Sequence, residues 1–99
     1  MSREFSVFIT PAAERSCKKL PRKVANFVFQ ELAALLGKNP LLGKPLALPL
    51  APLRSFHFSC EGQPYRAAYE VQALSQRVVI HFVGHRGDFY IRLRRVLGI

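Results

Sequence analysis

The residues best suited to chemistry follow an apolar stretch near the end of the chain. Residues 77–83 are largely apolar and rich in β-branched side chains, which predicts a buried strand, and His85, Arg86 and Tyr90 come shortly after it. An arginine binds phosphate oxygens through paired N–H groups and stays charged at neutral pH, while a histidine can transfer a proton. We therefore expect anion binding and proton transfer at the end of this strand.

A second strand should bring another arginine to the same place. Residues 64–71 alternate in character, and only a short polar connection separates them from the strand at 77–83, so the two should pair antiparallel. Arg66 alternates with the tyrosines of its strand and therefore points to the opposite face of the sheet. We expect Arg66 and Arg86 to converge on one surface.

The chain is strongly basic for its size. Lysine and arginine number 15 against 6 for aspartate and glutamate, which gives a formal net charge of +9. Such an excess favours a polyanionic partner, either nucleic acid or an acidic protein. The alternative is that the charge only keeps a small protein soluble.

The sequence does not indicate cofactor chemistry or secretion. Cys17 and Cys60 are widely spaced and lack a metal-ligand pattern, so we expect reduced thiols. There is no carboxylate cluster, Cys/His ligand spacing or glycine-rich phosphate loop, and we expect neither a metal nor a small-molecule cofactor. Neither a signal peptide nor an apolar run of membrane length is present, so the sequence predicts a cytoplasmic protein without membrane association.

Two helices should follow an N-terminal strand. Residues 5–9 alternate and predict a strand, after which Thr10 can cap a short helix at 11–19 that has proline in its first position. A leucine-proline pair breaks this helix, and a longer one should cover residues 21–37 and complete a helical hairpin. Its apolar stripe comprises Val24, Phe27, Val28, Leu32, Leu35 and Leu36.

The second half should complete the sheet and add a terminal helix. Residues 38–52 contain too many prolines for a helix or central strand, and their leucines favour a loop packed against the sheet. Residues 53–59 alternate and predict another strand, while Asp88 can cap the last helix. The order predicts one α+β domain over residues 1–99, with an N-terminal strand, a helical hairpin, an antiparallel three-strand meander and a short C-terminal helix. The apolar stripe of that helix comprises Phe89, Leu93, Val96 and Leu97.

Several segments, taken in order, carry a family resemblance. They are the pair Asn39-Pro40, the hydrophobic loop, the pair Leu53-Arg54, and the runs YRAAYEV, VVIHFVGHR and DFY at residues 65–71, 78–86 and 88–90. In this order they resemble the RelE/ParE superfamily of toxin–antitoxin toxins. The most specific signals are Tyr65-Arg66 and the segment from Gly84 to Tyr90, and nearly the whole chain takes part.

The resemblance implies a fold of the microbial ribonuclease type and a toxin that a cognate antitoxin wraps. In the RelE branch the toxin is an endoribonuclease that cuts mRNA in the ribosomal A site, so the implied partners are the antitoxin and mRNA on the ribosome. In the ParE branch the toxin instead poisons DNA gyrase and does no RNA chemistry. A third reading is a catalytically inactive homologue that acts only in a DNA-binding repressor complex with its antitoxin.

The family's catalytic positions carry over to three residues. Arg66 and Arg86 match its two arginines, and Tyr90 matches its C-terminal tyrosine. In RNA cleavage the arginines would neutralise the charge on the five-coordinate phosphorus. The alternative is that they form ion pairs, with Glu70 and Asp88 as partners.

The proton-transfer groups are less well defined. Phenols are protonated at neutral pH, so Tyr90 is a poor base unless neighbouring cations favour its phenolate; it can also stack on a nucleobase or be simply buried. His85 lies beside Arg86 and can protonate the leaving 5′ oxygen. His81 alternates with apolar neighbours, so we expect a hydrogen-bonded sheet residue.

One strand departs from the family pattern. RelE-like toxins often place two lysines there, whereas this chain has Arg54, Phe56 and His57. Arg54 can replace a phosphate-binding cation, but Phe56 cannot, so His57 or another group must take that role if RNA is cut. The residues expected to contact RNA are Arg54, His57, Arg92, Arg94 and Arg95.

Overall fold

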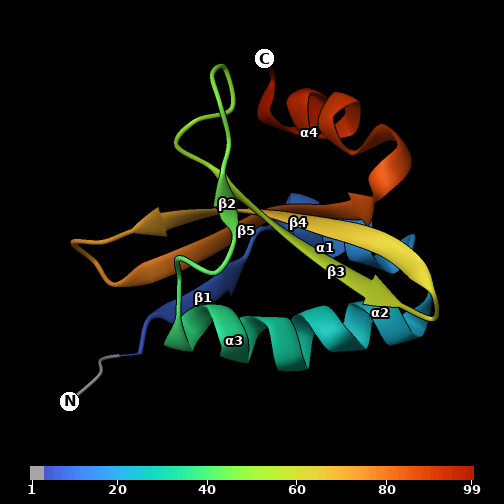
Figure 1. Cartoon of the computed structure of the whole chain (residues 1–99), viewed down its shortest axis with the longest axis horizontal. Helices are drawn as coiled ribbons and strands as arrows, with labels where there is room; N and C mark the ends of the chain where they lie inside the picture. Colours follow the sequence, from blue (N-terminus) through green and yellow to red (C-terminus); the bar gives the residue numbers. More distant parts are fainter. Residues whose placement is uncertain (1–3) are drawn as a thin grey trace.

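The computed structural model describes residues 4–99 and contains one mixed five-stranded sheet with helices on both faces (Figure 1). The sheet order is β1-β5-β4-β3-β2. This arrangement confirms the α+β fold and the three-strand meander expected from the sequence. The elements are β1 (Ser6–Ile9), α1 (Pro11–Lys18), α2 (Arg22–Asn26), the π-helical segment η1 (Phe27–Leu32), α3 (Ala33–Lys38), β2 (Lys44–Pro45), β3 (Arg54–Cys60), β4 (Gln63–Gln72), β5 (Arg77–His85), the 3-10 turn η2 (Arg86–Asp88) and α4 (Phe89–Leu97).

Strand β5 lies between β1 and β4 in the sheet, and it pairs parallel with β1 and antiparallel with β4. The predicted pairing of the two site strands is therefore confirmed. A β-bulge interrupts their register, since Ala68 pairs with Phe82 while Tyr69 pairs with Ile80. The extra residue in β5 reverses the alternation of side chains that follow it. Val83 therefore lies in the same core cluster as Ile80, whereas Phe82 lies in the cluster on the other face of the sheet.

The first helix begins as predicted. The Thr10 hydroxyl accepts a hydrogen bond from the backbone N–H of Ala13 at 3.0 Å, and Pro11 opens α1. The longer helix is continuous through α2, η1 and α3. Its fully buried side chains repeat every fourth residue, a spacing that overshoots each turn of an α-helix by about 40°. The wider π-helical turn reduces that drift and keeps one line of residues, Val24, Val28, Leu32 and Leu36, against the sheet.

The expected stripe of this helix was too wide. Leu35 is 42% exposed and does not belong to the core, whereas Phe27 is partly buried and stacks on Phe58 with ring centroids 4.8 Å apart. The prediction that the leucines of residues 38–52 pack against the sheet was also only partly correct. Leu46 and Leu50 pack under α4, but Leu41 and Leu48 lie exposed at 64% and 84%.

The terminal helix packs on the face of the sheet opposite α1 to α3 (Figure 1). Phe89 and Leu93 are buried there as predicted, but Val96 is 41% exposed, so its place in the stripe was wrong. The predicted cap was also wrong, because the Asp88 side chain makes no capping hydrogen bond. The turn before the helix instead uses His85, whose Nδ1 accepts from the N–H of Gly87 at 3.3 Å.

Further expectations concern the redox state of the cysteines, membrane-spanning helices and metal sites. Cys17 and Cys60 are free thiols, as predicted. Within residues 4–99, no helix combines the length and apolar character needed to cross a membrane. The same residues contain no group of three or more acidic, histidine or cysteine side chains arranged to hold a metal ion.

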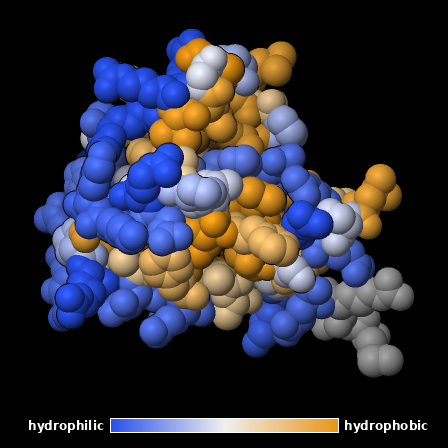
Figure 2. Space-filling view, turned by 180° about the vertical axis from the view of Figure 1, so that it is seen from behind, coloured by the Kyte–Doolittle hydropathy of each residue, from blue (hydrophilic) through white to orange (hydrophobic). Residues whose placement is uncertain are grey.

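Figure 2 shows the molecule from behind, with hydrophilic side chains gathered over the side on which α1 and α4 lie.

Candidate functional site

The predicted arginines meet at a hollow of about 230 Å3 at the end of the sheet. Strands β3 and β4 form its floor, and the turn η2 contributes its rim. The lining residues are His57, Phe58, Ser59, Pro64, Tyr65, Arg66 and Arg86. The convergence of Arg66 and Arg86 expected from strand alternation is confirmed.

Sheet register explains this meeting. His57 of β3 pairs directly with Arg66 of β4, and Arg66 pairs on its other side with Gly84 of β5. Residues paired across neighbouring strands project to the same face, so His57 and Arg66 stand side by side. Arg86 begins the turn just beyond Gly84 and therefore reaches the same end of the sheet.

Tyr90 reaches this surface from α4. The Arg66 guanidinium carbon lies 5.2 Å from the centroid of the Tyr90 ring, a cation–π contact. Tyr90 is 37% exposed, so the alternative of a simply buried tyrosine is wrong. The contact fixes the direction of Arg66 and leaves part of the Tyr90 ring open to a ligand.

Within residues 4–99, no ion pair compensates the charge of either arginine. Glu70, one expected partner, lies 3.1 Å from Nε2 of His81. Asp88, the other, forms no ion pair, and within residues 4–99 no carboxylate lies in ion-pair range of Arg66 or Arg86. The ion-pair alternative is therefore wrong for these residues, and His81 is the hydrogen-bonded sheet residue that the sequence predicted.

His85 does not line the hollow. Its ring packs edge-on against Tyr65 at a centroid distance of 5.5 Å, on the face of β4 opposite Arg66. Its Nδ1 accepts from Gly87 N–H, and its Nε2 lies 3.3 Å from Oε1 of Gln63, so it carries the proton on Nε2. These contacts hold the turn that presents Arg86.

Arg54 also stands apart from the hollow. Its Nε donates to the carbonyl oxygen of Gly43 at 2.9 Å, and its Nη2 donates to that of Leu41 at 3.3 Å. These bonds tie the loop before β2 to the sheet. Of the three residues at the family's lysine strand, only His57 lines the hollow.

The electrostatics of the hollow act on His57. Burial lowers the pKa of its imidazole below the ordinary 6.5, and the positive charges of Arg66 and then Lys44 lower the pKa further. His57 is therefore neutral at pH 7 and available to accept a proton.

The arginines of the last helix face elsewhere. Arg92 lies with its guanidinium carbon 5.6 Å from the centroid of Phe82, and Arg92 and Arg95 line a second opening beside α1. Arg94 is exposed and lines neither opening. The predicted site residues did not include four lining residues of the hollow, Phe58, Ser59, Pro64 and Tyr65. For Ser59 a signal was present, because its position two residues after His57 in the same strand places both on one face.

The hollow thus offers two unpaired guanidinium groups, a neutral imidazole and a partly exposed phenol at one rim. Guanidinium groups bind a phosphodiester and stabilise the additional negative charge of its transition state. A neutral imidazole can remove a proton from a sugar hydroxyl. The set suits phosphodiester transfer to a neighbouring hydroxyl without a metal.

Sequence comparison finds a family model that matches most of the chain. A family model described as the ParE-like toxin of type II bacterial toxin-antitoxin systems matches residues 7–94. A comparison with curated proteins gave no match.

Solved structures agree with the family match. The toxin–antitoxin complex RelBE2 from Mycobacterium tuberculosis contains a chain that is 32% identical, with a TM-score of 0.73, over 89% of this chain and 98% of that one. An arginine-to-alanine double mutant of E. coli toxin RelE in the free state is 16% identical, with a TM-score of 0.71, over 98% of both chains. The intact E. coli RelBE toxin–antitoxin complex gives 20% identity and a TM-score of 0.60, over 83% of this chain and 95% of that one. At this lower identity the two E. coli structures support the fold alone.

Proposed function

We propose that this chain, which belongs to the ParE-like toxin family of type II bacterial toxin–antitoxin systems, is a toxin that cuts mRNA on the ribosome. One observation carries this proposal: His57, Arg66 and Arg86 line a single hollow, and no carboxylate lies among its lining residues. We further propose that residues 1–99 form one toxin domain and that the protein acts in the cytoplasm, where ribosomes are.

In the proposed reaction Arg66 and Arg86 bind the scissile phosphodiester. His57 accepts the proton of the 2′-OH, the 2′ oxygen attacks phosphorus, and the bond from phosphorus to the 5′ oxygen breaks. The products are a 2′,3′-cyclic phosphate and a free 5′ hydroxyl. The arginines oppose the charge that develops on the non-bridging oxygens, and this stabilisation is greatest in the transition state.

Tyr90 is the proposed donor of the proton to the departing 5′ oxygen. A protonated phenol is a suitable donor to an alkoxide, and the cation–π contact keeps Tyr90 beside the phosphate-binding Arg66. His85, which the sequence offered for this step, is held by Gln63 and Gly87 on the other face, so we assign it to positioning the turn of Arg86.

The proposed partner is a cognate antitoxin. The M. tuberculosis structure and one of the two E. coli structures are toxin–antitoxin complexes, and the first of them has a similar sequence, at 32% identity. A net charge of +9 favours association with an acidic protein segment. Such a segment would compete with RNA for the same cations.

Arg86→Ala tests the assignment. Its side chain is exposed and lies at the hollow, so its loss should spare the fold and lower ribosome-dependent mRNA cleavage by roughly a hundredfold, as for loss of one oxyanion-stabilising donor. Cleavage is measured on ribosomes programmed with a defined mRNA. Arg22→Ala, which removes an exposed positive charge from α2, is the matched control and should cut at the wild-type rate.

A second candidate function is gyrase inhibition, which the ParE-like description of the matching family favours. Wild-type protein that blocks DNA supercoiling by gyrase and leaves the ribosomal mRNA intact would replace the proposed activity with this one. Protein inactive in both assays that still binds operator DNA together with its antitoxin would be a repressor component only.

A further inference from the structure

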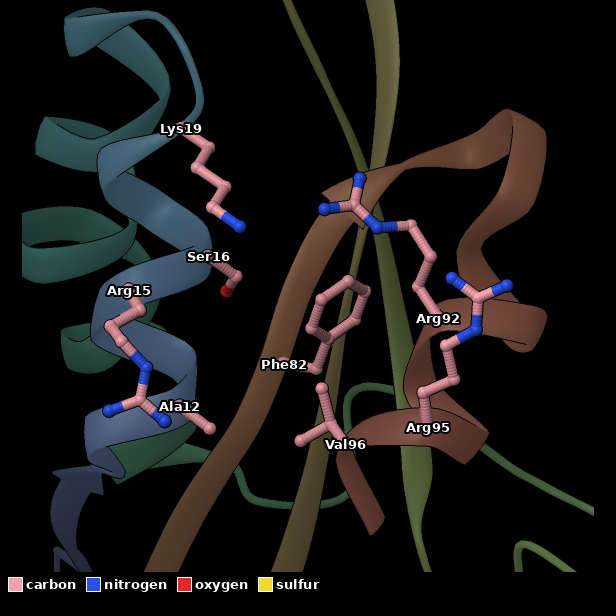
Figure 3. A pocket seen from close by; sticks show the side chains of 8 residues that line it. All are labelled: Ala12, Arg15, Ser16, Lys19, Phe82, Arg92, Arg95 and Val96. Atoms are coloured by element: carbon pink, nitrogen blue, oxygen red, sulfur yellow. The ribbon is translucent and has the colours of Figure 1, made fainter. Parts of the chain in front are cut away.

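A second opening, of about 200 Å3, lies between α1 and α4 beside β5 (Figure 3). It shares no lining residue with the hollow of Arg66 and Arg86. We call it the α1–α4 pocket. Its lining residues are Ala12, Arg15, Ser16, Lys19, Phe82, Arg92, Arg95 and Val96.

Half of these residues are cations, and they come from two walls. Arg15 and Lys19 extend from the α1 side, and Arg92 and Arg95 extend from α4 (Figure 3). Four like charges gathered around one opening repel one another, and a bound anion removes that cost. The pocket therefore has the charge expected of an anion site.

In the part of the chain that the structure describes, no ion pair neutralises these charges. No lining residue is acidic. Glu14, the carboxylate on α1, lies 3.5 Å from Lys18 Nζ in an exposed pair along the helix. Within residues 4–99, none of the ion pairs involves an arginine of the pocket.

The contacts that hold the walls in place use only one of the four cations, Arg92. The Ser16 hydroxyl donates to the carbonyl oxygen of Ala13 at 2.7 Å and accepts from the N–H of Val83 at 3.2 Å, which ties α1 to β5. On the other wall, the Arg92 guanidinium lies over the Phe82 ring. Within residues 4–99 the other three cations, Arg15, Lys19 and Arg95, form no ion pair and are available to a ligand.

We infer that the α1–α4 pocket binds the sugar–phosphate backbone of RNA at a second point, away from the bond that is cut. Three of its four cations are arginines, whose planar groups suit phosphate oxygens. Consecutive phosphodiesters carry closely spaced negative charges, which match four cations better than a single carboxylate side chain does. This inference rests on the proposed function only in taking RNA as the anion.

The last helix connects the two sites. Tyr90 near its start contacts Arg66 in the hollow, while Arg92 and Arg95 line the α1–α4 pocket. An RNA bound in the pocket therefore holds α4, and with it the ring against Arg66, in the position that the hollow requires.

Binding of a fluorescein-labelled 2′-O-methyl RNA dodecamer tests the inference apart from cleavage, because this RNA lacks the attacking hydroxyl. The Arg15→Ala/Arg95→Ala variant removes two exposed pocket cations and keeps Arg92 on Phe82. We expect anisotropy to show at least a fivefold weaker Kd near about 0.1 M KCl, and a slope of log K against log salt reduced by about 1.4, which is two phosphate contacts.

The matched control is Arg22→Ala/Lys38→Ala, which removes two exposed cations from the other helices and should change the Kd by less than twofold. Equal losses of affinity in the two double variants would overturn the inference, since the loss of charge alone would then explain the weaker binding.

A fluorescein-labelled decaglutamate peptide is the competing probe. If the pocket variant loses as much affinity for it as for RNA, the pocket belongs to an acidic protein partner and the RNA assignment fails. Neither result depends on whether the wild-type protein cuts mRNA.

Discussion

At the scale of single residues, the phosphate-binding cations also determine what His57 can do. Arg66 stands directly across the strand pair from His57, and its charge adds to burial in lowering the pKa of the imidazole. A histidine held neutral in this way is a base and not an acid at pH 7. The same guanidinium thus binds the phosphate and keeps its neighbour ready to take a proton.

The pH dependence of cleavage should show this effect. The pKa of His57 in the folded protein is below 6.5, so the neutral imidazole, which is the base form, predominates above pH 6.5. On the acid side, kcat/KM should therefore begin to fall only when the pH decreases below 6.5. Arg66→Gln removes one of the lowering charges, so its residual activity should fall at a higher pH. Single-turnover cleavage across the acid range measures both. An activity that rises as pH falls through 6.5 would mean that His57 acts as an acid.

Cys17 gives a second test at this scale. Burial and, to a smaller extent, the charge of Glu14 raise the pKa of its thiol to about 11. The thiolate needed for alkylation is therefore scarce at pH 8, and the thiol is also fully buried. Iodoacetamide should label Cys60 in the native protein and both cysteines in urea, as peptide mass mapping will show. Native labelling of Cys17 at the rate of Cys60 would contradict this packing.

The sequence predicted some of these residue positions and not others, for a structural reason. Arg66 could be placed because β4 alternates regularly. His85 could not, because the bulge opposite Ala68 adds a residue to β5 and moves the later side chains to the other face. Alternation counted from Ile80 puts His85 on the arginine side, whereas the structure puts it beside Tyr65. A bulge depends on the pairing of two strands and has no signal in either one alone.

At the scale of elements, a buried tyrosine connects the long helix to the sheet. Tyr69 of β4 is fully buried; its hydroxyl donates to the carbonyl oxygen of Pro40 and accepts from the N–H of Gly43, each at 2.7 Å. A Cβ on Gly43 would lie 2.7 Å from that hydroxyl, so only glycine fits. The loop after α3 is ordered by these contacts, which its leucine content did not reveal.

Tyr69→Phe should therefore destabilise the fold. It leaves a buried N–H and a carbonyl group without their partner, at a cost of about 1–3 kcal/mol. Urea unfolding followed by circular dichroism measures this. Tyr90→Phe is the control, because within residues 4–99 the Tyr90 hydroxyl makes no hydrogen bond. Equal unfolding midpoints for the two variants would show that the Tyr69 hydroxyl does not support the loop.

At the scale of the whole molecule, the charge excess is spatially organised. Arg66 and Arg86 line one opening, Arg15, Arg92 and Arg95 line another, and none of them has a carboxylate partner within residues 4–99. Composition predicted an anionic partner, but it could not locate the two openings, because the residues of the second come from opposite ends of the chain. This placement argues against a charge that serves solubility alone.

The affinity for ribosomes should therefore depend strongly on salt. If two arginines in each opening contact phosphates, four contacts at about 0.7 each give a slope near 2.8 and roughly a fiftyfold loss of affinity between about 0.05 and 0.2 M KCl. Co-sedimentation of the Arg86→Ala protein with ribosomes measures this affinity while little mRNA is cut. The lost contact should reduce the slope by about 0.7. The control is a triple variant that adds Arg22→Ala and Lys38→Ala to Arg86→Ala. It should show the same slope as Arg86→Ala alone, because Arg22 and Lys38 lie outside both openings. Affinity that stays constant over this salt range would mean that phosphate contacts do not drive binding, and the excess charge would then have no role in recognising RNA.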